Sequence, residues 1–304
     1  MGVTLATFNV ENLLEPRSGS EADSAFVAGK IDSIARMLRA CDADVVGLQE
    51  VGPPELLRAV VDRAEAGYRE TVVGTPDRRG IRCALLSRLP LVLSEVHTAE
   101  ALAFPVFFEG DPPPFGARIP LRRGVVHARV QAPGLGPLDV LVVHFKSSRR
   151  VALRSASGEE MPATTAGARA AGSLRSLVWR AAEALHVRGL VDGTMTGAGG
   201  ARVAVVGDLN DVPGSLPVRI VRGDGPAELL DCTTGVAAAA RFSVVHEEGA
   251  RQIDYVLASA ALHARLLDAR FLNAELAPRP PIALDGRHAP SVDSDHAPLV
   301  VRFG

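Results

Sequence analysis

Eight short runs rich in Val and Leu are spread along the 304-residue chain, each bounded by polar or turn-forming residues. Apolar runs of about four to eight residues with β-branched side chains favour buried strands over helices. Strands that are apolar along their whole length must be covered on both faces, which constrains the chain to stacked layers. The runs are VTLATFNV, ADVVGLQEV, RCALLSR, VVHARVQA, LDVLVVHFKSS, ARVAVVGDLN, RQIDYVLAS and HAPLVVRF.

Amphipathic helical patterns lie between some of these runs, over residues 23–40, 53–66 and 166–188. Strands alternating with helices predict an α/β (α+β) fold in which two packed β-sheets form a sandwich flanked by helices. The absence of an internal repeat or a clear linker favours a single domain over residues 1–304. The third helical pattern predicts an amphipathic stripe formed by Leu174, Leu177, Val178, Ala181 and Leu185.

Long connections are expected at residues 101–123 and 276–293, both rich in proline. Loops of more than about 15 residues are uncommon in compact domains unless they serve a function or are disordered. The glycine-rich stretch GLVDGTMTGAGGA, just before residue 202, has no phosphate-binding signature and is interpreted as a connector.

Composition excludes some classes of protein. Aromatic residues make up 4% of the chain, which argues against an exposed base-stacking platform for nucleic acids. The formal net charge is −2, so the protein has no overall basic field, although a local basic face stays open.

Cys41, Cys83 and Cys232 are too far apart for a metal motif and are interpreted as reduced thiols of the core. No signal peptide and no apolar span long enough to cross a membrane is visible, and we expect a cytoplasmic, monomeric protein.

Polar residues that could take part in catalysis or metal binding stand at or near the ends of six of the apolar runs. Each of them alone fits a turn, a solvated strand end or a hydrogen-bonded core histidine. Together they would be costly if buried unpaired, and they are explained if they converge on a cation and a phosphoryl group. They are Asn9 and Glu11, Glu50, His144 and Lys146, Asp208 and Asn210, Asp254, and Asp295 with His296.

The ordered motifs TFNVENL, LQEV, VVHFKS, GDLND, IDYVLAS and SDHAPL resemble the endonuclease/exonuclease/phosphatase superfamily. This fold is shared by DNase I-like nucleases, abasic-site endonucleases, inositol polyphosphate 5-phosphatases and bacterial sphingomyelinases. The similarity runs from residue 4 to residue 303, and GDLND and SDHAPL are its most specific motifs. It implies a DNase I-like sandwich with the site along one edge.

The resemblance implies a metal site for Mg²⁺, with Mn²⁺ as an alternative. Glu50 matches the principal metal ligand and Asn9 matches the amide beside it. Glu11 stands near the same metal, and Asp295 is an additional candidate ligand. Carboxylate and water oxygens are the ligands that Mg²⁺ prefers.

The same resemblance implies catalytic roles. Asp208 matches the carboxylate that aligns or deprotonates the attacking water, and Asn210 matches the amide that holds the phosphate. His296 matches the histidine on the scissile phosphate, and Asp254 matches the acid paired with it. His144 matches a second histidine. The implied reaction is hydrolysis of a phosphate ester without a covalent enzyme intermediate.

Basic residues near these motifs have two open readings. Arg82 stands where several relatives carry an acid that supports the second histidine, so it is either a phosphate ligand or a surface residue. Lys146 and Arg149, with Arg150 and Arg154, form either a solvated loop or a clamp for a substrate phosphate.

The leading functional hypothesis is a Mg²⁺-dependent phosphodiesterase with nuclease-like activity on a phosphate-ester substrate, nucleic acid being one candidate. The alternatives are a phosphomonoesterase, a lipid or small-molecule phosphodiesterase of the inositol-phosphatase or sphingomyelinase type, and a catalytically dead binding module. A zinc hydrolase is disfavoured because no H-E-x-x-H motif is present. Substrate choice is expected to depend on residues 101–123, 147–165 and 276–293.

Overall fold

A computed structural model of the chain describes residues 2–16, 18, 20–102, 119–154, 159–196, 200–246, 249–278 and 291–304. Most of the two long connections predicted at 101–123 and 276–293, and part of the 147–165 loop, lie outside these residues. Within the described part of the chain, no helix combines the length and the apolar character that a membrane span needs.

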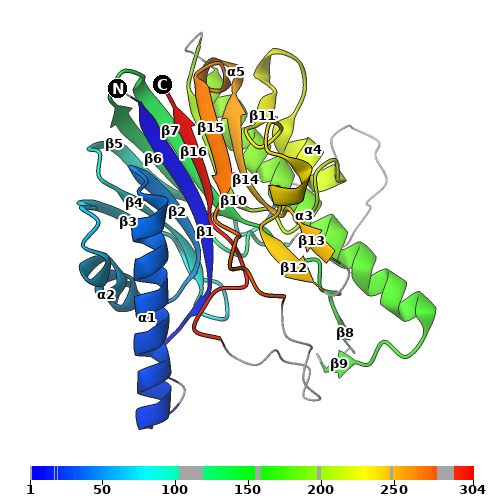
Figure 1. Cartoon of the computed structure of the whole chain (residues 1–304). Coiled ribbons are helices and arrows are strands. Elements are labelled where there is room, and N and C mark those ends of the chain that lie inside the picture. Colours follow the sequence, from blue (N-terminus) through cyan, green and yellow to red (C-terminus); the bar gives the residue numbers. More distant parts are fainter. Residues whose placement is uncertain are drawn as a thin grey trace.

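Two mixed six-stranded sheets form the centre of the molecule (Figure 1). The first, sheet A, has the order β15 (Leu266–Phe271), β16 (Leu299–Phe303), β1 (Val3–Leu13), β2 (Val45–Val51), β4 (Arg82–Ser87), β3 (Glu70–Val73). The second, sheet B, has the order β11 (Leu229–Asp231), β14 (Asp254–Ser259), β10 (Val203–Asp208), β7 (Gly136–His144), β6 (Val125–Ala132), β5 (Leu91–His97). Two small hairpins accompany them: β8 (Leu153–Arg154) with β9 (Glu160–Met161), and β12 (Val244–His246) with β13 (Gly249–Arg251).

The main core lies between the facing sides of the two sheets. Leu5 and Leu85 of sheet A belong to one buried cluster with Val142 and Val206 of sheet B. The sheets approach each other closely at Gly47, where an added Cβ would lie 2.7 Å from Val206 Cγ2. The predicted sandwich is confirmed, and its face-to-face sheets bring the ends of strands from both layers to one edge.

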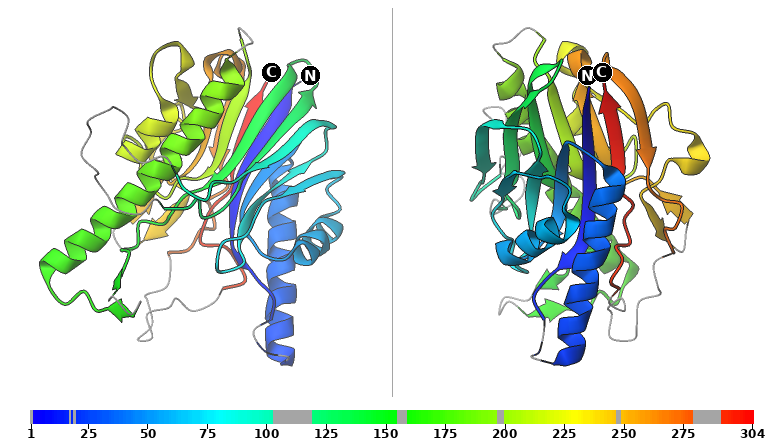
Figure 2. Two further views of the ribbon diagram at one scale, coloured as in Figure 1. Left: turned by 180° about the vertical axis from the view of Figure 1, so that it is seen from behind. Right: turned by 60° about the vertical axis from the view of Figure 1, so that its left-hand side comes forward.

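Helices cover the outer face of each sheet (Figure 2). On sheet A, α1 (Glu21–Cys41) and α2 (Pro54–Ala64) bury their apolar sides in a second cluster, and Ser20 caps α1 by accepting a hydrogen bond from the Asp23 amide. On sheet B, α3 (Ala166–Met195) and α4 (Leu216–Arg222) enclose a third cluster. A short helix, α5 (Ala260–His263), follows β14, and two 3₁₀ turns, Gly225–Ala227 and Ala238–Ala240, lie in connections.

The predicted amphipathic stripe of α3 does not form the buried face of the helix. Leu174 is 59% exposed and the other four members are half-buried, whereas Gly172, Ser176, Arg180 and Glu183 are buried. The first half of α3 therefore turns a polar face toward the protein, because that face packs against the loop that follows β7. The predicted connector before residue 202 is also shorter than expected, because α3 continues to Met195.

Candidate active site

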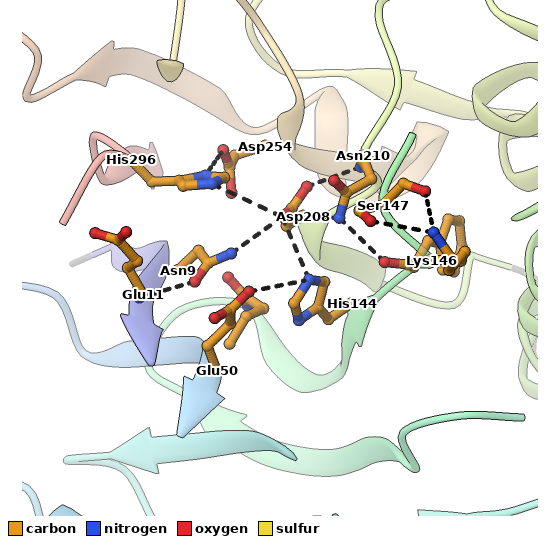
Figure 3. Close-up of polar contacts among 12 residues, drawn as sticks. Asn9, Glu11, Glu50, His144, Lys146, Ser147, Asp208, Asn210, Asp254 and His296 are labelled. Carbon is orange, nitrogen blue, oxygen red and sulfur yellow. Dashed lines mark hydrogen bonds and ion pairs between the residues drawn. The ribbon is translucent and has the colours of Figure 1, made fainter. Parts of the chain in front are cut away.

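Strand pairing brings three of the predicted residues together. In sheet B, Asp208 at the end of β10 is the register partner of His144 on β7 and of Asp254 on β14. In sheet A, β1 and β2 are parallel neighbours, so Asn9 and Glu50 lie toward the same end of that sheet. Figure 3 shows these side chains directed toward one another from both sheets.

Asp208 is the centre of the polar network. Its Oδ1 accepts a hydrogen bond from the Asn210 amide N at 2.8 Å. Its Oδ2 accepts bonds from Asn9 Nδ2 and Asn210 Nδ2, both at 3.0 Å. Asn210 Nδ2 also donates to the Phe145 carbonyl oxygen at 3.0 Å. Asp208 is 1% exposed, so these bonds fix the carboxylate in one orientation at the edge of sheet B.

His296 and Asp254 form a buried pair beside Asp208. The Nδ1 atom of His296 donates to Asp254 Oδ2 at 2.8 Å, and Nε2 lies 4.0 Å from Asp208 Oδ2 (Figure 3). The backbone of His296 is held by Ser294 Oγ, which accepts from its amide at 3.0 Å and donates to the Asn9 carbonyl oxygen at 2.7 Å. The segment before β16 is thereby joined to β1.

His144 stands between the two sheets. Its Nε2 lies 3.5 Å from Asp208 Oδ2 and 3.9 Å from Glu50 Oε1, so both carboxylates lie close to one imidazole nitrogen. The predicted convergence of Glu50 and Asp208 on a shared site therefore agrees with the geometry. Burial, followed by the charges of Arg123 and His296, holds the pKa of His144 well below its usual range, so the ring is neutral at pH 7.

Backbone conformation is unusual at this edge. Among the described residues, six non-glycine residues have positive φ, and two of them, Asp42 and Glu65, are ordinary helix C-caps. The other four belong to the site or its border, and such conformations concentrate at functional sites. These four are Glu11 at 50°, Asn12 at 54°, Glu50 at 61° and Asn210 at 53°.

The charges of the site depend on one another. Burial and the nearby charge of Asp254 raise the pKa of Asp208 to about 7, against the opposing effect of His296. Burial alone would lower the pKa of His296, but the charge and hydrogen bond of Asp254, helped by Asp295 and Asp208, raise it to about 10. The imidazole is therefore a cation at neutral pH, poised beside a carboxylate that titrates near neutrality.

Oxygen donors suited to a hard divalent cation surround Glu50. The Glu50 Oε2 atom accepts from the Asn12 amide at 3.1 Å, which orients the carboxylate. Asn9 Oδ1 accepts from the Glu11 amide at 3.0 Å and keeps a second lone pair. Glu11 Oε2 accepts from the Asp295 amide at 3.2 Å, which ties together the other two predicted ligands.

A second donor group overlaps the catalytic residues. Asp208, Asp254 and His296 offer one donor atom each within 4.8 Å of one another. Asp254 Oδ1 is buried and has no hydrogen-bond partner among the described residues. Crowded carboxylates with a buried unpaired oxygen fit a bound cation, and the oxygen-rich set around Glu50 fits Mg²⁺ or Mn²⁺.

The predicted phosphate ligands lie farther from the centre. Lys146 Nζ donates to the Ser147 carbonyl and hydroxyl oxygens and to the Arg149 carbonyl oxygen, at 2.7, 3.2 and 2.9 Å, so it holds the loop in place. Arg149 has an exposed side chain on that loop. Arg82 donates to the Gly80 carbonyl oxygen at 3.2 Å and shares the helix-covered face of β4 with Ala84. Substrate contact by these three residues stays a prediction.

Lys146 also lines the wall of a basic cavity. Its volume is about 580 Å³, and Arg78, Arg122, Lys146 and Arg175 contribute cations to its wall, with Glu160 as an acid. The guanidinium of Arg122 lies 5.3 Å from the ring centroid of Trp179, in a cation–π contact. Lys146, which follows His144 by two residues, lines this cavity, whereas the predicted catalytic residues are not part of its wall.

Several residues of this region were missed by sequence reasoning. Glu183 Oε2 accepts from the Lys146 amide at 2.6 Å, and burial raises the pKa of Glu183 to about 7. Arg123 donates to the carbonyl oxygens of His144 and Phe145, at 3.0 and 3.2 Å. Arg79 Nη2 lies 3.9 Å from Glu50 Oε2. These residues come from α3 and from loops, where no strand-end pattern marks them.

A second cavity lies beside His296. This cavity of about 520 Å³ runs between α1 and residues 272–278, and Glu11, Asp293 and His296 contribute polar atoms to its wall. The buried Lys30 of α1 donates to the Ser291 carbonyl oxygen at 3.1 Å. Burial lowers the pKa of Lys30, and the nearby charges of Glu11, Asp295 and Glu50 oppose that effect.

Comparisons with known proteins agree with this geometry. The model described as Endonuclease/Exonuclease/phosphatase family matches residues 6–296. No curated protein sequence matches the chain.

Solved structures resemble the chain over its whole length. Truncated TDP2 of Caenorhabditis elegans has a TM-score of 0.62 at 16% identity, over 99% of this chain and 97% of that one. The 3' phosphatase NExo from Neisseria, bound to a product DNA hairpin, has a TM-score of 0.56 at 18% identity over 99% of each chain. Sphingomyelinase C from Streptomyces griseocarneus has a TM-score of 0.58 at 17% identity over 100% of each chain. At such identities the likeness establishes a shared DNase I-like fold.

Proposed function

The chain belongs to the endonuclease/exonuclease/phosphatase family, a family of phosphoesterases, and we propose that it is a metal-dependent hydrolase that cleaves a phosphodiester in a nuclease-like reaction. The observation that carries the proposal is the convergence of Glu50, His144, Asp208 and the Asp254–His296 pair at one edge of the sandwich. An imidazolium, a carboxylate of raised pKa and an oxygen-rich cation site are the groups that in-line attack on a phosphate needs.

In the proposed reaction Asp208 aligns the attacking water and accepts its proton. The raised pKa of this carboxylate suits it to proton transfer at neutral pH, because a base works best near the pH at which it operates. Asn210 and Asn9 keep the carboxylate in place through their amide groups. Asn210 then holds a phosphate oxygen by exchanging its Nδ2 hydrogen bond to the Phe145 carbonyl oxygen for one to the substrate.

His296 acts on the charge that grows at the phosphate. Asp254 keeps the ring protonated and oriented, so Nε2 donates a hydrogen bond to the phosphoryl oxygen. His144, which is neutral, donates from Nε2 to the same group. A Mg²⁺ or Mn²⁺ ion held by Glu50 and Asn9, with Glu11 and Asp295 nearby, would supply Lewis-acid stabilisation of the phosphate and the leaving oxygen.

The basic cavity favours a substrate with more than one phosphate. Arg78, Arg122 and Arg175 suit phosphate oxygens, which arginine binds in bidentate fashion. A nucleic-acid backbone or a polyphosphorylated small molecule supplies a second phosphate. A headgroup that ends in a quaternary ammonium would meet like charge there, which supports the nuclease-like reading over the lipid alternative.

A hydrolysis panel tests the proposal. Plasmid DNA, RNA, abasic duplex, inositol phosphates, sphingomyelin and bis(p-nitrophenyl) phosphate are incubated with Mg²⁺ or Mn²⁺, with and without EDTA. We expect metal-dependent cleavage of the chromogenic diester and of a nucleic acid, abolished by EDTA. Asp208→Ala lowers the rate by about 10²–10⁴-fold, the usual contribution of a positioned base.

Asp224→Ala, at an exposed position after α4, is the matched control and keeps full activity. Cleavage restricted to monoesters, or to sphingomyelin, favours the corresponding alternative on the same fold. If Asp208→Ala matches the wild type on every ester, the catalytic assignment is wrong and the binding-module reading takes its place.

A further inference from the structure

A second group of side chains of the types that ligate metals lies on the outer face of sheet B, at the edge strand β5. Glu95 and His97 are on β5 and His127 is on β6, two strands and one strand away from β7, which carries His144. One donor atom from each of the three lies within 4.8 Å of the others. This group is separate from the catalytic residues and takes no part in the proposed reaction.

His127 is fixed in one tautomer. Its Nε2 lies 2.9 Å from Asp139 Oδ1, and Asp139 also accepts from Arg129 Nε at 3.0 and 3.1 Å. A carboxylate that accepts from one imidazole nitrogen leaves the lone pair of the other nitrogen exposed, the arrangement found behind metal-binding histidines. The Nδ1 lone pair of His127 therefore points away from Asp139, toward β5.

The donor atoms have the spacing of a tetrahedral site. His97 Nε2 and His127 Nδ1 lie 3.2 Å apart. Two nitrogen ligands bound to Zn²⁺ at 2.0–2.1 Å in a tetrahedron are about 3.4 Å from each other. Glu95 Oε2 lies 3.6 Å from His97 Nε2 and adds a carboxylate oxygen to the two nitrogens. A hydrogen bond between the two imidazole rings would account for the 3.2 Å distance. It does not account for the carboxylate of Glu95 beside them.

We propose that Glu95, His97 and His127 bind one Zn²⁺ ion, which clips the edge strand β5 to β6. Two imidazoles and a carboxylate form a ligand set that Zn²⁺ commonly takes, with a position left for a further ligand.

The surroundings support a site that binds metal from solution. Glu95 has a side chain that is 50% exposed, and that of His97 is 24% exposed, so an ion can reach them. His127, in contrast, is buried and rigidly held. His186 belongs to α3, the helix that covers this face of sheet B, and its Nε2 is buried with no hydrogen-bond partner within the described part of the chain.

Metal titration of the EDTA-stripped, full-length protein tests the proposal. Zn²⁺ is titrated in competition with a chromogenic chelator, and Co²⁺ is used in parallel for its visible absorption. Because the catalytic centre also offers donors, the titration is repeated on His296→Ala. We expect that variant to keep one Zn²⁺ with the Co²⁺ bands of a four- or five-coordinate site, and the double variant His97→Ala/His296→Ala to lose it.

Two further variants keep the test decisive. Glu95→Gln changes an exposed side chain that the fold does not need, and it weakens Zn²⁺ binding at least tenfold. His263→Ala, a histidine of α5, is the matched control and binds as the wild type does. If His97→Ala and Glu95→Gln retain the wild-type stoichiometry and affinity, the three residues form only a hydrogen-bonded cluster and the proposal is wrong.

Discussion

The charge of His296 depends chiefly on one neighbour, Asp254. Burial opposes the imidazolium, and the Asp254 carboxylate outweighs burial, so the pKa of His296 rises to about 10. A group with a raised pKa is protonated at every lower pH, and its positive charge is lost as the pH rises through that pKa. If the imidazolium stabilises the scissile phosphate, activity persists through neutral pH and falls near pH 10.

Asp254→Asn tests this dependence. Without the Asp254 carboxylate, only Asp295 and Asp208 still oppose the effect of burial, so the pKa of His296 falls and the alkaline fall in activity moves down by about 1–3 pH units. A pH profile of kcat/KM for the chromogenic diester measures the shift. Asp268→Asn, which removes an exposed acid from β15, leaves the profile unchanged. An alkaline limb that stays in place in Asp254→Asn contradicts the assigned role of the pair.

For individual residues, sequence reasoning found those at the ends of strands. It missed those that reach the site from helices and loops. Asp208, Asp254 and His296 sit in short local motifs, so their types and order were readable. Glu183 lies in the middle of a helix and Arg79 in a loop, and only packing brings them to the site. Nothing in the residues next to them along the chain signals that contact.

At the level of elements, the predicted strands and the missed strands have different places in the sheets. All eight predicted runs contain interior strands, while β3, β5, β11 and β15, which were not predicted, are the edge strands of the two sheets. Interior strands are covered on both faces and read as continuous apolar runs. Edge strands are half exposed, so their mixed sequences give a weak signal.

The buried face of α3 differs from the predicted stripe, and this difference gives a prediction about stability. Val187 is fully buried in the cluster over sheet B, whereas Leu174 of the predicted stripe is largely exposed. Val187→Ala removes buried methyl groups and leaves a cavity, so the free energy of unfolding falls by about 1–3 kcal/mol. Leu174→Ala changes it by less than about 0.5 kcal/mol. Urea denaturation of both variants measures the difference. Equal losses in the free energy of unfolding would show that Leu174 contributes to the buried face of α3 as much as Val187 does.

α3 also carries a reporter for the basic cavity. Trp179 is the one tryptophan of the sequence, and Arg122 stacks on it. We expect tripolyphosphate to change the tryptophan fluorescence of the wild type, because binding at Arg122 and Arg175 alters the contact with the indole. Arg122→Gln weakens binding about 10–100-fold, the usual worth of hydrogen bonds to a charged group.

The same variant separates binding from catalysis. Arg122→Gln lowers kcat/KM for a substrate with a second phosphate and leaves the chromogenic diester unaffected. Arg58→Gln removes the same charge from an exposed position of α2, on the outer face of sheet A, and changes neither measurement. A fluorescence response that is identical in Arg122→Gln and the wild type rules out phosphate binding in this cavity.

On the scale of the whole molecule, the site joins the two sheets. Asn9 and Glu50 come from sheet A, and His144, Asp208 and Asp254 come from sheet B. A cation held by Glu50 and Asn9 of sheet A, beside the catalytic residues of sheet B, would bind the folded state and not the unfolded chain, so it would stabilise the fold by mass action. The gain is about 2.7 kcal/mol when the free ion reaches 100 times its Kd.

Glu50→Gln distinguishes stabilisation by a bound cation from stabilisation by side-chain packing at Glu50. In the metal-free protein the substitution removes one carboxylate from a crowded site, so the melting temperature stays the same or rises, as is common when a functional charge is removed. With Mg²⁺ or Mn²⁺ the wild type gains several degrees, while Glu50→Gln gains little, since its principal ligand is lost. Thermal melts over a metal series, with Arg58→Gln as the control, measure the difference. A variant that loses stability without metal and still responds fully to the ion would show that Glu50 supports the fold and does not hold the cation.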